Sequence, residues 1–213
     1  PIVGVSIAVD FSGPPKGPVL QAAAPPDPRR DGMLALFAMS EAGYANLIKL
    51  VSHAHLGVAE GADPHVTFAD VERHAAGLIA LSGGPDGPVD RMLANGNGEV
   101  AGARLDKLMG VFGDRLYVEI QRHGLPREQE IEAELVALAY ARDLPLVAVN
   151  EPYFAKADDY EAHDALLAIA DGRTLNEDNR RRLSREHGFK SAEAMAKLFA
   201  DLPEALASTI EIA

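Results

Sequence analysis

The 213-residue sequence contains no cysteine and no tryptophan, and only 6% of its residues are aromatic. Without cysteine the chain can form neither a disulfide nor a cysteine-bound zinc site, which fits a reducing compartment. Basic residues are also few, because 20 of them stand against 32 acidic residues, a net charge of −12. Such a chain repels a phosphate backbone on average, so it is a poor candidate for holding DNA alone.

Long apolar runs are missing as well, since no stretch approaches the 18 residues that a membrane-spanning helix needs. The chain starts at Pro1 rather than at a methionine, and no signal peptide follows. We therefore expect a cytoplasmic protein, and a chain that was processed or cut from something longer. Hydrophobic residues make up 47% and charged residues 24%, which is typical of one large globular domain.

Strand and helix patterns follow one another along most of the chain. Strands are predicted at residues 2–11, 33–39, 78–81, 116–120 and 146–149. Helices are predicted at residues 41–56, 67–77, 89–95, 99–112, 126–142, 160–170, 191–201 and 204–213. Residues 12–30 contain six prolines and are predicted to be a loop. From Leu78 onward the alternation predicts parallel strands with crossover helices, and the absence of glycine-rich nucleotide-binding motifs favours a (β/α) barrel or part of one.

Polar or glycine-rich loops follow three consecutive predicted strands. They contain Ser82-Gly83-Gly84, His123 and Asn150-Glu151-Pro152-Tyr153. In a barrel the carboxyl ends of the strands form the functional rim, so we expect these loops to face one pocket, with His123 and Glu151 as the best site candidates. The alternative is that these side chains only hold the rim backbone. Two candidate ligands are too few for a hydrolytic metal cluster.

The remaining histidines and the basic run give weaker signals. On a helix, the side chains of His53 and His55 lie about 200° apart, so they cannot share an ion. The run from Arg180 to Arg185 is predicted to be a solvated face.

Six strings of this sequence, at residues 43–56, 77–87, 112–131, 144–154, 160–175 and 190–213, occur in the order known from one family. Among them are GLIALSGGPDG and LPLVAVNEPYF. Together they resemble the PHP domain of bacterial replicative DNA polymerase III alpha subunits. The resemblance implies a distorted (β/α)₇ barrel with outer helices and, in intact members, a rim cluster of zinc or manganese.

The resemblance also implies a single PHP-like domain over residues 1–213 that is truncated at both ends. The family's early His-x-His and Thr-Asp-His motifs are missing, and residues 191–213 are expected to lead toward an absent polymerase palm domain. The magnesium-dependent polymerase carboxylates would lie in that absent part.

The family's metal ligands are largely replaced in this sequence. By the resemblance, they fall on Ser6, Met33 and Gly84, and the Asn-Asp-x-His motif becomes Asn150-Glu151-Pro152-Tyr153. Only His123 and Glu151 keep ligand chemistry. We therefore expect a vestigial rim at His123, Asn150, Glu151 and Tyr153, with no catalytic residue and no bound metal in this segment.

By the resemblance, the segment serves a DNA-directed DNA polymerase as a scaffold and as a docking site for the proofreading exonuclease subunit. Its partners are then the rest of the alpha subunit and the exonuclease, while DNA is reached only through the parent polymerase. A metal-dependent phosphoesterase or 3′–5′ proofreading nuclease is the alternative, and an unrelated α/β binding domain is a third. Missing first strands would leave an open barrel edge, which predicts a dimer of the fragment.

Overall fold

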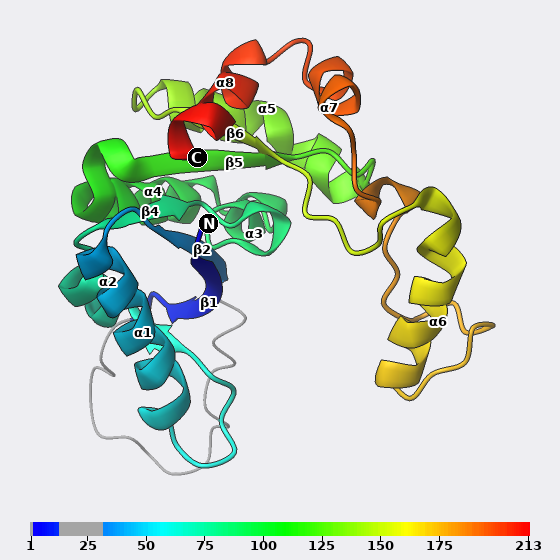
Figure 1. Cartoon of the computed structure of the whole chain (residues 1–213), viewed down its shortest axis with the longest axis horizontal. Coiled ribbons are helices and arrows are strands. Elements are labelled where there is room, and N and C mark those ends of the chain that lie inside the picture. Colours follow the sequence, from blue (N-terminus) through cyan, green and yellow to red (C-terminus); the bar gives the residue numbers. More distant parts are fainter. Residues whose placement is uncertain (1, 13–31) are drawn as a thin grey trace.

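The computed structural model describes residues 2–12 and 32–213, and it contains a six-stranded sheet with helices around it (Figure 1). The strands lie in the order β3-β1-β2-β4-β5-β6. Their bounds are Gly4–Asp10 for β1, Met33–Ala38 for β2, Val66–Thr67 for β3, Leu78–Leu81 for β4, Leu116–Gln121 for β5 and Leu146–Val149 for β6. The proline-rich loop predicted at residues 12–30 falls almost entirely outside the described residues.

The second half of the sheet has the predicted parallel topology. β4 pairs in parallel with β5, and β5 pairs in parallel with β6. The first half differs, because β2 runs antiparallel to both of its neighbours, β1 and β4. The mixed sheet is compatible with a partial (β/α) barrel, and among the described strands its two outer members, β3 and β6, do not pair with each other.

The helices occupy the predicted regions, with small shifts at their ends. Their bounds are Glu41–Leu56 for α1, Phe68–His74 for α2, Asp90–Ala94 for α3, Gly98–Phe112 for α4, Pro126–Tyr140 for α5, Tyr160–Ala170 for α6, Ala192–Leu198 for α7 and Pro203–Ile212 for α8. Pro203 was expected to end a helix but instead begins α8, because the first helical position needs no N–H donor.

Local capping explains where α2 begins. The Thr67 side chain accepts a hydrogen bond from the Asp70 backbone N–H, and Asp70 accepts one from Thr67 in return. The helix ends at His74, three residues before the expected stop at Gly77. Gly77 instead has a φ of +71° and leaves no room for a side chain beside Ser40 and Gly43.

The main hydrophobic core lies between the sheet and the surrounding helices, α1 to α5 together with Phe199 and Ala205 near α7 and α8. It includes Leu36, Leu78, Leu116 and Leu146 from the strands. A smaller cluster on the opposite face comprises Leu81, Tyr117 and Val147, with Ile212 of α8 against it. All six residues of β5 are buried, so both faces of this strand are covered.

Helix α6 stands away from the sheet on an arm that leaves β6 and returns before α7 (Figure 1, yellow to orange). The basic run inside this arm lies mostly at the surface, as predicted, and three of its arginines form ion pairs. Arg180 contacts Asp164 at 2.5 Å, Arg181 contacts Asp171 at 3.1 Å and Arg185 contacts Glu161 at 3.2 Å. These pairs fasten the segment after α6 to the helix itself. No helix within residues 2–12 and 32–213 is long and apolar enough to cross a membrane.

Candidate functional site at the sheet rim

The loops that follow β4 and β6 meet the end of β5 at one cavity of about 470 Å³. The sequence predicted that the loops after all three strands would face one pocket, but His123 in the loop after β5 does not line this cavity. Apolar side chains on the sheet face opposite the main core line part of this cavity. The polar and conformationally special positions around the cavity are Ser6, Gly83, Asp86, Glu119, Gln121, Glu151 and Tyr153, and the apolar ones are Met33, Ala35, Phe37, Leu81 and Val149.

Glu119 is the buried acid of this cavity, with only 4% of its surface exposed. Gln121 donates a hydrogen bond from Nε2 to Glu119 Oε1 at 2.5 Å, and the Glu119 backbone N–H donates to Ser82 Oγ at 2.9 Å. Burial raises the pKa of Glu119 to about 7, and the Glu151 carboxylate pushes it in the same direction. The sequence analysis missed Glu119, although a lone acid inside an otherwise apolar strand was a usable signal.

Glu151 and Tyr153 lie on the opposite wall, directly after β6. Glu151 has a φ of +40°, a conformation that a non-glycine residue seldom adopts. The Tyr153 hydroxyl donates to Glu151 Oε1 at 3.0 Å. Burial, together with the charge of Glu151, raises the pKa of Tyr153 to about 12. Tyr153 therefore stays protonated at neutral pH and acts toward Glu151 as a hydrogen-bond donor.

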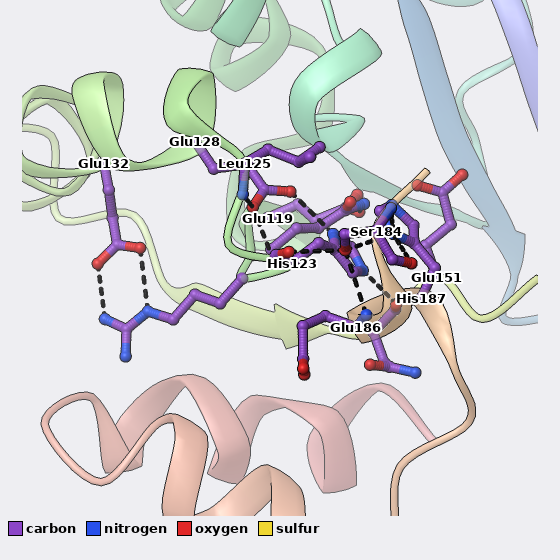
Figure 2. A network of polar contacts seen from close by, with 12 residues as sticks. Glu119, His123, Leu125, Glu128, Glu132, Glu151, Ser184, Glu186 and His187 are labelled. Atoms are coloured by element: carbon purple, nitrogen blue, oxygen red, sulfur yellow. Dashed lines mark hydrogen bonds and ion pairs between the residues drawn. The ribbon is translucent and has the colours of Figure 1, made fainter. Parts of the chain in front are cut away.

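His123 lies behind the cavity wall rather than in it, with 1% of its surface exposed. Its Nδ1 contacts Glu128 Oε1 at 2.8 Å, and its Nε2 contacts the carbonyl oxygen of Asn150 at 2.6 Å (Figure 2). Burial alone would lower the pKa of His123, but these two hydrogen bonds outweigh it and raise the pKa. Since a carbonyl oxygen and an ionised carboxylate both accept, His123 is an imidazolium paired with Glu128.

His187 stacks on this charged ring, with the ring centres 3.8 Å apart. Burial, and then the charge on His123, lowers the pKa of His187 to about 4, so His187 is neutral at physiological pH. Its Nδ1 accepts from the Ser184 backbone N–H at 3.2 Å. His187 was not among the candidates from sequence, because nothing in the chain order places it beside His123.

Further bonds join this histidine pair to the arm. Ser184 Oγ donates to the His123 carbonyl oxygen at 2.7 Å, and Asn150 Nδ2 donates to the Gly188 carbonyl oxygen at 3.0 Å. The Tyr153 backbone N–H donates to the His187 carbonyl oxygen at 2.9 Å. The segment that returns from α6 is thus fastened to the ends of β5 and β6. We call His123, Glu128, Asn150, Ser184 and His187 the histidine node.

The other histidines lie elsewhere. His53 on α1 is 3.6 Å from Asp70 and its ring packs edge-on against His74. His163 on α6 contacts the rings of Tyr153 and Phe154 at its own end of the arm. None of these three histidines lines the cavity at the sheet rim.

The sheet, its surrounding helices and the rim cavity define a mixed α/β domain. Comparison with known proteins identifies the family of this domain. The family model described as "PHP domain" matches residues 1–123. Since that match covers more than half of the chain, the chain belongs to the PHP domain family.

Individual relatives are more specific. The chain is 51% identical, over its whole length, to DNA polymerase III subunit alpha of Caulobacter vibrioides. It is 39% identical to the same subunit of Rickettsia bellii and 40% identical to that of Pseudomonas aeruginosa, each over 84% of the chain. The aligned region makes up 18%, 15% and 15% of these relatives, so the chain spans less than a fifth of their length.

The residues at this rim do not fit the metal cluster of intact PHP domains. The cavity wall offers the carboxyl groups of Asp86, Glu119 and Glu151, but no imidazole, and Glu119 is buried and bonded to Gln121. The positions where the family has further ligands carry the thioether of Met33 and the hydroxyls of Ser6 and Tyr153. His123 has both ring nitrogens engaged, by Glu128 and by a backbone carbonyl. A hard divalent ion needs carboxylate or imidazole ligands in a converging set. Within the described part of the chain, no group of three or more histidine, cysteine, aspartate or glutamate side chains could hold a metal ion.

Proposed function

We propose that this chain is the PHP segment of a replicative DNA polymerase III alpha subunit and that it works as a scaffold with a degenerate metal site. The parent protein would be a DNA-directed DNA polymerase of the cytoplasm that uses magnesium in its polymerase site. The observation that carries the proposal is the state of His123. Its two nitrogens serve an internal ion pair and a backbone bond, so they contribute to stability rather than to hydrolysis.

The charge balance favours the scaffold role over direct contact with DNA. The net charge of −12 disfavours a phosphate backbone, and several of the arginines after α6 are already paired with acids of the same arm. DNA would then be reached only through the rest of the alpha subunit. A protein partner suits such a surface better, and we propose that this partner is the proofreading exonuclease subunit.

Docking is tested by mixing the purified 213-residue chain with the exonuclease subunit of the same replication machinery. We expect the two to elute together in size-exclusion chromatography and to give a one-to-one complex by light scattering. Separate elution at tens of micromolar of both proteins would contradict docking through this segment. The scaffold proposal would survive that result.

The alternative, a phosphoesterase or 3′–5′ nuclease, draws on Glu119 and Glu151, two carboxylates that line one cavity. It is tested by hydrolysis of a 3′-labelled DNA strand with added manganese. We expect no turnover above background in the wild type, His123→Ala or Glu151→Ala. Turnover that is present in the wild type and lost in Glu151→Ala would favour the alternative.

A further inference from the structure

The turn between α3 and α4 contains two asparagine–glycine pairs in a row, Asn95-Gly96 and Asn97-Gly98. Asparagine is one of the thermolabile residues. Its weak point is the side-chain amide carbon, which the backbone nitrogen of the next residue can attack. Glycine in that next position has no Cβ to obstruct the approach. Both asparagines are exposed, so both amides are open to water.

Two hydrogen bonds hold the first pair in place. Gly96 has a φ of +71°, and its N–H donates to the Leu93 carbonyl oxygen at 2.8 Å. The Asn97 N–H donates to the Met92 carbonyl oxygen, also at 2.8 Å. Together these bonds form a Schellman motif, a common ending of a helix. The nitrogen that would attack Asn95 is therefore engaged, and turning its peptide group toward the Asn95 side chain disrupts both bonds.

The second pair lacks this restraint. Gly98 is the first residue of α4, and its N–H has no hydrogen-bond acceptor within the described part of the chain, because the first N–H groups of a helix find no partner inside it. Turning the Asn97–Gly98 peptide group toward the Asn97 side chain costs one bond, from the Ala101 N–H to the Asn97 carbonyl oxygen at 3.0 Å. That bond lies at a helix end, where fraying opens it. The two pairs thus share one sequence but differ in the availability of the attacking nitrogen.

We propose that Asn97 is a site of spontaneous deamidation in this protein and that Asn95 is protected from it. The Gly98 backbone nitrogen gives its proton to solvent and forms a bond to Cγ of Asn97. The C–N bond of the side-chain amide breaks, so ammonia leaves and a cyclic succinimide remains. Water then opens the succinimide at either carbonyl carbon. The products are aspartate and isoaspartate, and each adds a negative charge at the start of α4.

Isoaspartate has the larger structural consequence. It routes the backbone through the former side chain and lengthens the main chain just where α4 begins. Gly98 leaves little room for such a shift, since a Cβ at this position would lie 2.6 Å from Glu134 Oε1 of α5. We expect the modification to loosen the contact between α4 and α5. This inference goes beyond the scaffold proposal and does not depend on it, because it rests only on the turn between α3 and α4.

The test incubates the wild-type 213-residue chain at mildly alkaline pH, in buffer and in concentrated urea. Peptide mapping by mass spectrometry follows the conversion of each asparagine. In the folded chain we expect Asn97 to convert about tenfold faster than Asn95, because reaction at Asn95 disrupts one more hydrogen bond. In urea the two sites should convert at similar rates, since both are followed by glycine. The comparison needs no variant, so no folding defect enters it.

Matched substitutions provide a second measurement. Asn97→Gln should remove most of the acidic species that accumulates in the folded chain, because the longer side chain must close a larger ring. The Asn97 side chain makes no capping hydrogen bond to α4, so its replacement should not disturb folding. Asn95→Gln is the control and should leave the rate unchanged. Equal conversion of both asparagines in the folded chain, faster conversion at Asn95, no conversion at Asn97, or equal effects of the two substitutions would overturn the proposal.

Discussion

The histidine node and the rim cavity lie next to each other at the ends of β5 and β6, yet they treat their polar groups differently. In the node, His123 and Glu128 are almost fully buried, and each ring nitrogen of His123 has a partner. In the cavity, Glu151 is exposed and bonds to the neighbouring Tyr153, while Met33 and Phe37 occupy much of the wall. The node is one fully hydrogen-bonded network, whereas the cavity has two separate hydrogen-bonded pairs, Gln121 with Glu119 and Tyr153 with Glu151.

This difference indicates which rim residues are constrained by folding. A buried charged pair strongly destabilises a protein when one partner is lost, whereas an exposed carboxylate is replaced at little cost. The ligand-like His123 is thus held in place by its structural role. Ser6, Met33 and Tyr153, where the family resemblance places ligands, have no such role in common. The contrast predicts large effects of substitutions in the node and small ones in the cavity.

The largest effect is expected for His123→Ala. The substitution leaves the Glu128 carboxylate buried without its cation and frees the Asn150 carbonyl, so we expect a loss of about 3–5 kcal/mol in the free energy of unfolding. Urea denaturation followed by circular dichroism measures it. His55→Ala on the exposed face of α1 is the control and should change the value by less than about 0.5 kcal/mol. A loss in His123→Ala as small as in the control would refute the structural role of the node.

A pH-dependent effect of intermediate size is expected for Glu119→Gln. The pKa of Glu119 is about 7 in the folded state and near 4.5 when unfolded, so the wild type prefers the neutral acid. Its stabilising contribution is full below pH 4.5 and is lost as the pH rises through about 7. The amide stays neutral throughout. Relative to the wild type, Glu119→Gln should therefore become more stable between pH 5 and pH 8, as measured by urea denaturation at each pH. A stability difference that is constant with pH would contradict the desolvated state of Glu119.

The smallest effect is expected for Glu151→Gln in the cavity. The Tyr153 hydroxyl can donate to the amide oxygen as it does to the carboxylate, and the side chain is exposed. The free energy of unfolding should change by less than about 0.5 kcal/mol. Differential scanning calorimetry with Tyr153→Phe as a companion measures this. A loss comparable to that of His123→Ala would remove the distinction between node and cavity.

Much of the second half of the fold can be predicted from sequence. Each strand there is a short, mainly apolar run, and the segment after it has apolar residues at helical spacing. The bounds of α6, for example, agree with the predicted range of residues 160–170. The antiparallel position of β2 could not be derived, since a strand carries no local mark of its neighbour's direction. The ion pairing of Arg180 and its neighbours depends on how the chain folds back along α6. These pairs are tertiary contacts, so the local sequence does not predict them.

The candidate site was predictable in outline only. Chain order placed Gly83, His123 and Glu151 after the ends of adjacent parallel strands, and of these Gly83 and Glu151 line one cavity while His123 does not. It could not show that His123 faces Glu128 and His187 instead, because the direction of a side chain at a strand end depends on the packing beneath it. Glu119 was overlooked because strand periodicity does not tell which of two covered faces an acid occupies.

The most direct test of the account is a titration of the 213-residue chain with manganese and with zinc in a calorimeter, because the central claim is that this rim has lost its metal chemistry. We expect no stoichiometric binding of either ion, and the same heats for the wild type and Glu151→Ala. Binding of one or more equivalents per chain that disappears in Glu151→Ala would contradict the claim. It would show that the rim still binds metal, as the active sites of metal-dependent hydrolases do.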